Sequence, residues 1–291
     1  MSEKSTIIIP TVNNCNYLKL CIDSIKKNSF YNHQIIVHIN GIDNESENYL
    51  IGSNILYTKS DTNIGLCSGV NLASKKSNTD FIVYSHDDMY YLPKWDYYLF
   101  VEINKLKDNK FYFSSTHISH YPKNKDIINH IFFDSGKDLD SFNEKFLLSN
   151  YEDLQFHDLQ GSHWAPHIIH KKIWDRIGGF SEEFNPGFGS DPDLNMKLWK
   201  EGVRIFKAVN KSRVYHFGSL TTRKNKDIKR NDGRKTFLLK WKITMNYFIK
   251  YYLNRGKKYY NPLPDHKLSF TNFIPFILSK LKYYVKRNNG K

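Results

Sequence analysis

The sequence contains few cysteines and no long apolar run. Among its 291 residues, Cys15, Cys21 and Cys67 are scattered and form no C-x-x-C pair. Neither a disulfide framework nor a structural zinc site is therefore indicated, and a reducing compartment fits best. No window approaches the ~20 apolar residues that span a bilayer, and the first residues lack the apolar stretch of a signal peptide. We expect a cytoplasmic protein, free or bound peripherally at the cytoplasmic face of a membrane.

Acidic residues are scarce in the last third of the chain. The net charge is +14, yet residues 1–202 hold 20 basic and 26 acidic residues. Residues 203–291 hold 23 basic residues against three acidic ones, Asp227, Asp232 and Asp265. A mildly acidic body followed by a strongly basic tail predicts a catalytic part and a part that meets an anionic surface.

The first ~90 residues alternate between short apolar runs and amphipathic segments. The runs at 6–10, 34–39, 55–57 and 80–85 predict strands. Helical spacing joins Leu18, Cys21, Ile22 and Ile25, and a second helix is expected from Gly65. This pattern predicts an α/β fold, with a mainly parallel, Rossmann-like sheet flanked by helices. Ligands bind such sheets at the carboxyl ends of the strands, where the polar clusters 11–14, 40–43 and 86–88 fall.

The remaining chain is assigned more coarsely. Between 110 and 175 only 111–113 and 131–133 look strand-like, whereas 233–253 and the segment after Pro275 show helical spacing. We expect a catalytic domain over 1–220, with halves of about 1–110 and 111–220. A basic, aromatic-rich helical extension over 221–291 would follow.

Three groups of residues could carry chemistry. Asp87 and Asp88 leave a buried strand together, and a divalent cation such as Mg²⁺ or Mn²⁺ would neutralise them, although a helix-capping turn is the structural alternative. Asp191 precedes Pro192 at a predicted helix start, where it is either an N-cap or a general base whose pKa the helix dipole lowers. His216, in the short strand 214–218, would bind metal or phosphate, or be structural.

In their order and spacing these residues resemble the family-2 inverting glycosyltransferases of the A-type, nucleotide-binding fold. The resemblance covers roughly residues 5–220. It is carried by Ile7-Ile8-Ile9-Pro10-Thr11, Asn40-Gly41-Ile42-Asp43, Asn63-Ile64-Gly65, Phe81 through Asp88, Gly178-Gly179-Phe180 and Ser190-Asp191-Pro192-Asp193.

The resemblance implies a role for each matching residue. Asp88 and His216 would bind Mn²⁺ or Mg²⁺, and Asp191 would be the catalytic base. The nucleotide-sugar contacts would be Pro10, Thr11, Asn13, Asn40, Asp43, Asn63, Gly65, Asn71 and Asp87. The chain departs from many relatives at His86, where they have an acidic or amide residue, and at Ser190, where they have glutamate. It also departs at Val70, where many have arginine, and at Asn13, where many have an aromatic residue.

The implied reaction moves a sugar from a nucleotide-diphosphate sugar to an acceptor hydroxyl with inversion. Residues 1–110 would then form the nucleotide-sugar half of the catalytic domain and residues 111–220 the acceptor half. The chain lacks the Gln-x-x-Arg-Trp motif of processive relatives, so a single addition in polysaccharide or glycoconjugate synthesis is expected. For the glycan or glycoconjugate acceptor we expect Gly161, Trp164 and Asp193. An exposed Trp164 would stack on a sugar face, whereas a buried one would be core.

Two other protein classes are weighed. A nucleic-acid-binding protein would carry basic residues across the sheet region, but this region is acidic, so no specific nucleic-acid partner is expected. A nucleotidyltransferase would show a glycine-rich basic loop near the first strand, and residues 11–14 contain neither. The tail either packs on the catalytic domain or forms an in-plane membrane helix over Phe276–Arg287, attracted by anionic lipid.

Overall fold

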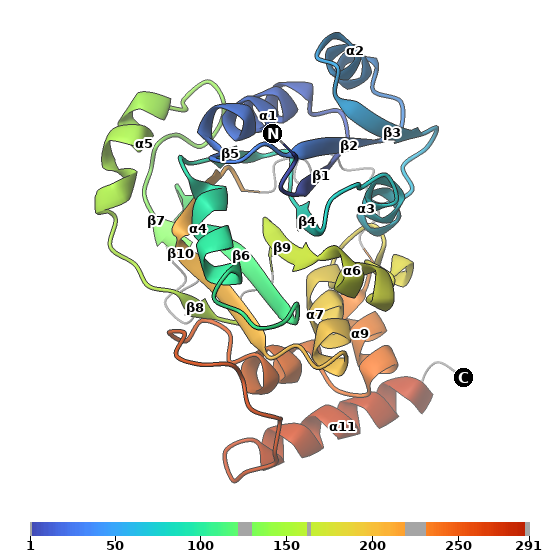
Figure 1. Cartoon of the computed structure of the whole chain (residues 1–291). Coiled ribbons are helices and arrows are strands. Elements are labelled where there is room, and N and C mark those ends of the chain that lie inside the picture. Colours follow the sequence, from blue (N-terminus) through green and yellow to red (C-terminus); the bar gives the residue numbers. More distant parts are fainter. Residues whose placement is uncertain (1, 122–129, 162–163, 219–230, 289–291) are drawn as a thin grey trace.

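The computed structural model describes residues 2–121, 130–161, 164–218 and 231–288 (Figure 1). The strands are β1 (Thr6–Thr11), β2 (Gln34–Asn40), β3 (Leu56–Ser60), β4 (Phe81–Tyr84), β5 (Met89–Tyr91), β6 (Phe111–Ser119), β7 (His130–Phe132), β8 (Leu159–Gln160), β9 (His167–His170) and β10 (Ile205–His216). The α-helices are α1 (Cys15–Asn28), α2 (Asn44–Gly52), α3 (Leu66–Ser74), α4 (Trp95–Ile103), α5 (Glu144–Asn150), α6 (Lys171–Ile177), α7 (Ser190–Lys200), α9 (Gly233–Trp241), α10 (Met245–Tyr247) and α11 (Phe273–Asn288). Three short turns of other helix types complete the set: η1 (Tyr151–Asp153), η2 (Glu182–Phe184) and η3 (Phe248–Tyr252).

One mixed sheet runs through the molecule in the order β3-β2-β1-β4-β9-β6-β10-β5. Strands β1 to β4 pair in parallel, and β9 and β5 run antiparallel to their neighbours. Helices α1 and α2 lie on one side of β1–β3 and α3 lies on the other (Figure 1). The predicted α/β architecture is confirmed, with a sheet that is mixed in direction.

The first strand shows why the apolar runs predicted this half correctly. Ile7, Ile8 and Ile9 are fully buried because helices cover both faces of β1, and so successive side chains enter apolar layers on either side. On α1, Leu18 and Ile22 are also fully buried, on the face that their spacing predicts.

The middle of the chain holds two strands that the apolar signal revealed only in part. Every residue of β6 is buried, although Ser114 to His117 are polar, and β10 extends back to Ile205. These polar groups bond across the sheet: Ser115 Oγ lies 2.7 Å from Ser212 Oγ, and Thr116 donates to the Val209 carbonyl at 3.1 Å. Polar residues that are satisfied in this way enter a core strand without an apolar pattern.

The C-terminal segment packs on the catalytic body through α9, α10 and η3. Phe237, Phe248 and Leu253 are fully buried in the same core as the sheet. The single helix expected over 233–253 is wrong, because α9 ends at Trp241 and Lys242 takes a left-handed conformation with φ 59°. The domain boundary expected near residue 220 lies outside the described residues.

Candidate active site

Two segments far apart in sequence meet where β4 ends. After Tyr84 the chain passes through His86 and Asp88 into β5, and β5 pairs antiparallel with the end of β10, so that His216 is the register partner of Met89. The Phe217 amide donates to the Asp88 carbonyl at 3.2 Å. This ladder brings His86, Asp88 and His216 together, with one possible ligand atom from each within 4.8 Å of the others.

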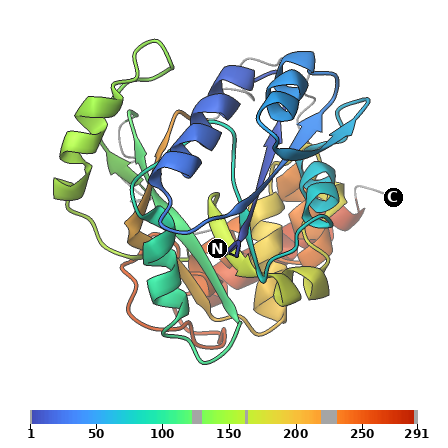
Figure 2. The same cartoon turned by 45° about the horizontal axis from the view of Figure 1, so that its top comes forward.

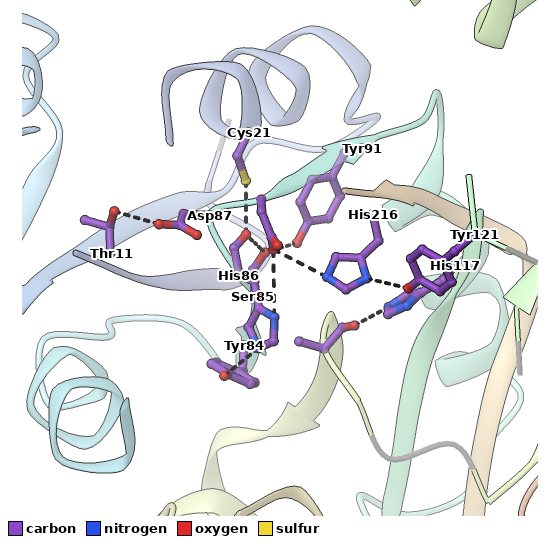
Figure 3. A network of polar contacts seen from close by, with 12 residues as sticks. Thr11, Cys21, Tyr84, Ser85, His86, Asp87, Tyr91, His117, Tyr121 and His216 are labelled. Atoms are coloured by element: carbon purple, nitrogen blue, oxygen red, sulfur yellow. Dashed lines mark hydrogen bonds and ion pairs between the residues drawn. The ribbon is translucent and has the colours of Figure 1, made fainter. Parts of the chain in front are cut away.

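The two histidines point toward one carboxylate oxygen. Asp88 Oδ1 lies 3.5 Å from His216 Nε2 and 4.0 Å from His86 Nδ1. The second nitrogen of each ring contacts a tyrosine hydroxyl, His86 Nε2 that of Tyr84 at 2.8 Å and His216 Nδ1 that of Tyr121 at 3.3 Å (Figure 3). Outer contacts of this kind orient the imidazoles that bind metals.

The donor set can hold a divalent metal ion. Burial lowers the pKa of His86 to about 4, which leaves a neutral imidazole with a free lone pair near neutral pH. One carboxylate oxygen and two imidazole nitrogens suit a transition metal better than Mg²⁺, which prefers oxygen ligands alone. His86, which sequence reasoning marked only as a departure from the family, is thus the third member of the group.

Asp87 turns away from this group. Thr11, the last residue of β1, donates its hydroxyl to Asp87 Oδ2 at 2.7 Å, and Figure 3 shows the pair apart from His216. Burial, and then the neighbouring charge of Asp88, raises the pKa of Asp87 to about 7. The two adjacent carboxylates therefore lie in different surroundings, Asp87 beside Thr11 and Asp88 beside the two histidines.

Asp191 is the second residue of α7 and not its cap. Gly189, with φ 92°, is the N-cap residue, and no side chain caps this helix end. Asp191 is partly buried, and among the described residues its Oδ1 has no hydrogen-bond partner. Burial raises its pKa to about 7. The expected lowering by the helix dipole is wrong, because the cost of desolvating the charged form outweighs the favourable dipole.

Asp191 and the metal-binding group share one environment. The Asp191 charge adds to burial in raising the pKa values of Tyr84 and Tyr112 well above the usual tyrosine value, so the carboxylate lies within electrostatic range of both rings. The Tyr84 hydroxyl in turn contacts His86. Tyr84 therefore contacts one candidate metal ligand and lies within electrostatic range of the candidate base.

The polar residues at the other strand ends hold loops together. Asn40 accepts from the Ile64 amide at 2.7 Å, and Asn63 accepts from the Gly65 amide at 2.9 Å. Asp43 caps α2 by accepting from the Ser46 amide at 3.0 Å. These three side chains gather at the carboxyl edge, as predicted, and their nucleotide contacts stay predictions.

The remaining residues predicted to contact the nucleotide differ in their exposure and hydrogen bonding. Pro10 lies within β1, and Asn13 is exposed in a left-handed conformation with φ 49° just beyond it. The Asn71 side-chain amide makes two hydrogen bonds to the backbone of Phe180, donating to its carbonyl at 2.8 Å and accepting from its amide at 2.9 Å. These two hydrogen bonds link α3 to the double-glycine segment, a structural role that sequence reasoning did not foresee.

Gly65 is required by a residue that sequence reasoning missed. Its φ is +86°, and a Cβ there would lie 2.3 Å from Asn185 Oδ1. Asn185 accepts from the Cys67 amide at 2.9 Å, so it caps the start of α3 from a loop far along the chain. The Asn-Pro pair at 185–186, just before the predicted base, was the available signal.

The three predicted acceptor residues separate in space. Gly161 is buried, with a Cβ position 2.3 Å from the Leu253 carbonyl, and Asp193 is fully buried and accepts from the Trp241 indole at 2.7 Å. Both therefore attach the C-terminal segment, and neither meets solvent. Trp164 is partly buried, with its ring 6.1 Å from that of His117. Since His117 lies 4.9 Å from the ring of His216, Trp164 is the predicted acceptor residue that borders the site.

The interior beside Asp191 holds polar groups that sequence reasoning missed. His167 of β9 lies with its ring 4.8 Å from Tyr112 and 5.1 Å from Tyr84. In the described part of the chain, neither ring nitrogen of His167 nor the Tyr112 hydroxyl has a hydrogen-bond partner. Burial lowers the pKa of His167 to about 3, so the ring is neutral. These groups lie in apolar strands and had no motif to mark them.

The fold and the site define a glycosyltransferase of the A-type, nucleotide-binding fold. Residues 6–174, more than half of the chain, match the family model for Glycosyl transferase family 2, and the chain belongs to this family. The resemblance expected from the sequence is confirmed.

Known proteins resemble the chain in fold or over part of its sequence. TarS of S. aureus, residues 1–349, superposes with a TM-score of 0.54 at 14% identity, over 73% of this chain and 60% of that one. The same TarS fragment has been solved with UDP and with UDP-GlcNAc, with TM-scores of 0.54. An uncharacterized glycosyltransferase of Rickettsia prowazekii is 35% identical over 108 residues, 36% of this chain and 33% of the relative. Another from Rickettsia typhi is 34% identical over the same length. The chain thus aligns with about a third of these curated relatives.

Proposed function

We propose that this glycosyltransferase moves a sugar from a nucleotide-diphosphate sugar to an acceptor hydroxyl, with a metal ion and with inversion at the anomeric carbon. The observation that carries the proposal is the group His86, Asp88 and His216, whose possible ligand atoms all lie within 4.8 Å of one another. Asp191, whose Oδ1 has no hydrogen-bond partner among the described residues, would supply the base. The binding of UDP and UDP-GlcNAc by TarS supports a uridine nucleotide as the first donor to test.

Asp88, His86 and His216 would hold the ion, and their mixed nitrogen and oxygen atoms favour Mn²⁺ over Mg²⁺. When bound, the ion supplies positive charge to the departing nucleotide diphosphate. The neutral state of His86 and the tyrosine contacts of both histidines keep the donor atoms directed inward.

Asp191 would be the general base. The acceptor oxygen forms a bond to the anomeric carbon, the bond from that carbon to the diphosphate oxygen breaks, and the acceptor proton passes to Asp191. A single displacement from the opposite side inverts the configuration. With its pKa near 7, the carboxylate is a stronger base than an ordinary aspartate and is still substantially ionised at neutral pH.

The acceptor would be a glycan or glycoconjugate that receives one sugar. Trp164 would stack on it, since the residue is only partly buried and its ring lies 6.1 Å from that of His117, next to His216. Membership in a glycosyltransferase family favours this function over nucleic-acid binding and nucleotidyl transfer.

The test is hydrolysis of UDP-, GDP- and dTDP-sugars by the purified protein with Mn²⁺, Mg²⁺ or EDTA. We expect release of one nucleotide with Mn²⁺, lost in EDTA and in Asp88→Ala. Asp175→Ala, which removes an exposed carboxylate on α6, is the matched control and should retain full activity. Failure of every nucleotide-sugar to turn over or to raise the melting temperature with metal would overturn the proposal.

A second measurement concerns the base itself. Once an acceptor supports transfer, Asp191→Asn should lower kcat by about 10²–10⁴-fold with little change in donor KM. NMR of the product should show an anomeric configuration opposite to that of the donor, and retention would refute the single displacement.

A further inference from the structure

Helix α11 packs on the protein with one side only. Ser279 and Tyr283 are 3% and 8% exposed, and the Ser279 hydroxyl accepts from the Thr244 amide at 2.6 Å. Phe276 lies on the same side, with its ring 5.6 Å from that of Tyr247. Figure 1 shows α11 along the edge of the molecule, next to α9, and in Figure 2 this red helix lies at the back. The helix predicted over Phe276–Arg287 is part of α11, which begins earlier, at Phe273. Phe276 faces inward, and contact of the helix with a membrane stays a prediction.

The opposite side of α11 is apolar and uncovered. The spacing i, i+3, i+4, i+7 and i+11 puts five residues on one face, about half a turn from Ser279 and Tyr283. The five residues are 41% to 66% exposed: Ile274, Ile277, Leu278, Leu281 and Val285. Two exposed phenylalanines come just before this face in the sequence, Phe270 at 103% and Phe273 at 52% exposure. A contiguous apolar face of this kind marks an interaction surface.

Basic residues lie on both sides of this face. In helical projection Lys282 lies next to the face, with Lys286 further round on the same side. On the other side Tyr284 comes first and Lys280 and Arg287 follow, with the Lys280 ammonium 5.3 Å from the centre of the Phe276 ring. The helix contains no acidic residue, within a C-terminal third that carries 23 basic residues against three acidic ones. An apolar stripe between cationic flanks matches the acyl chains and phosphates of an anionic bilayer.

We propose that α11 binds in the plane of an anionic lipid bilayer, with the five apolar residues inserted and the four basic residues among the headgroups. In the described ranges no helix is long and apolar enough to cross a membrane, so the contact is in-plane. A second copy of the chain fits the face less well, because pairing two such helices brings lysines together with no carboxylate from either helix. The proposal rests on this geometry and does not depend on the donor or the metal.

The test is co-sedimentation of the full chain with vesicles of phosphatidylcholine, with and without one third phosphatidylglycerol. Leu278→Glu with Leu281→Glu should lower the partition coefficient at least tenfold on anionic vesicles, because two charges would enter the apolar layer. Lys282→Gln with Lys286→Gln should lower it by about fivefold for each lysine on anionic vesicles only. Ile51→Glu is the matched control, an apolar residue 60% exposed on α2, and should bind as the wild type does.

Nucleotide-sugar hydrolysis without vesicles should be the same in all these variants, which separates failure of this proposal from failure of the proposed reaction. Unchanged circular dichroism would show that each variant is folded. Absence of wild-type binding to anionic vesicles, or binding that both double variants retain, would overturn the proposal. A dimer in sedimentation velocity that Leu281→Glu dissociates, without vesicle binding, would assign the face to a second copy instead.

Discussion

Replacing Asp191 by asparagine should stabilise the protein and remove the proposed base. The pKa of Asp191 is about 7 in the fold, against 3.8 for an unperturbed aspartate, because burial penalises the charged form. Between these values the folded state holds a proton that the unfolded state has lost. The free energy of unfolding of the wild type therefore falls as pH rises from about 4 to 7, then levels off. Asparagine cannot ionise and escapes this loss.

The size of the effect follows from the two pKa values. At about 1.4 kcal/mol for each pH unit, their separation corresponds to an upper limit of about 4 kcal/mol above pH 7. Asp191 is only partly buried, and solvent reduces the penalty, so we expect Asp191→Asn to be about 2–4 kcal/mol more stable than wild type at pH 8. Near pH 4 the two proteins should differ little.

The assay is urea unfolding of wild type and Asp191→Asn at pH 4, 6 and 8, without metal or nucleotide. Other titrating groups, including Asp87, are present in both proteins and cancel in the difference. Asp175→Asn, at an exposed carboxylate paired with Lys171, is the control and should change stability by less than about 1 kcal/mol at every pH. A difference that does not grow with pH, or a wild type that is more stable at pH 8, would refute the assignment of a buried, destabilised carboxylate.

Three further predictions concern the site and its supports. The kcat/KM of transfer should rise with pH through about 7 at saturating Mn²⁺, since Asp191 must be ionised to accept a proton, and a flat profile from pH 5 to 8 would count against it as the base. His216→Ala should weaken Mn²⁺ binding by about 10–100-fold in calorimetry because one ligand of the group is lost, and unaltered affinity would place the metal elsewhere. Trp241→Phe should cost about 1–3 kcal/mol in urea unfolding, because Asp193 loses its indole donor in a fully buried position, while donor KM stays the same; a KM effect alone would point to a substrate contact.

Local sequence determined the first half of the sheet and the places where chemistry could occur. Apolar, β-branched runs such as Ile7-Ile8-Ile9 report burial on both faces, and helical spacing reports one buried side, so both patterns are readable without tertiary contacts. Strand ends share one edge, and this rule alone placed Asp87 near the end of the first strand. The strands β6 and β10 were predicted only in part, because their polar residues hydrogen-bond across the sheet and so leave no apolar pattern.

Only the tertiary structure decided which of these residues act together. His216 reaches Asp88 through the β5–β10 ladder, and His86 joins them because the chain turns after β4, facts of pairing that no local pattern contains. The fold also set the pKa of Asp191, since desolvation depends on what surrounds a carboxylate and not on its place in a helix. Tertiary packing likewise decided that Asp193 accepts a hydrogen bond from the Trp241 indole. The periodicity of the sequence predicted an apolar face on α11, but only packing showed which side of the helix stays uncovered by the rest of the protein.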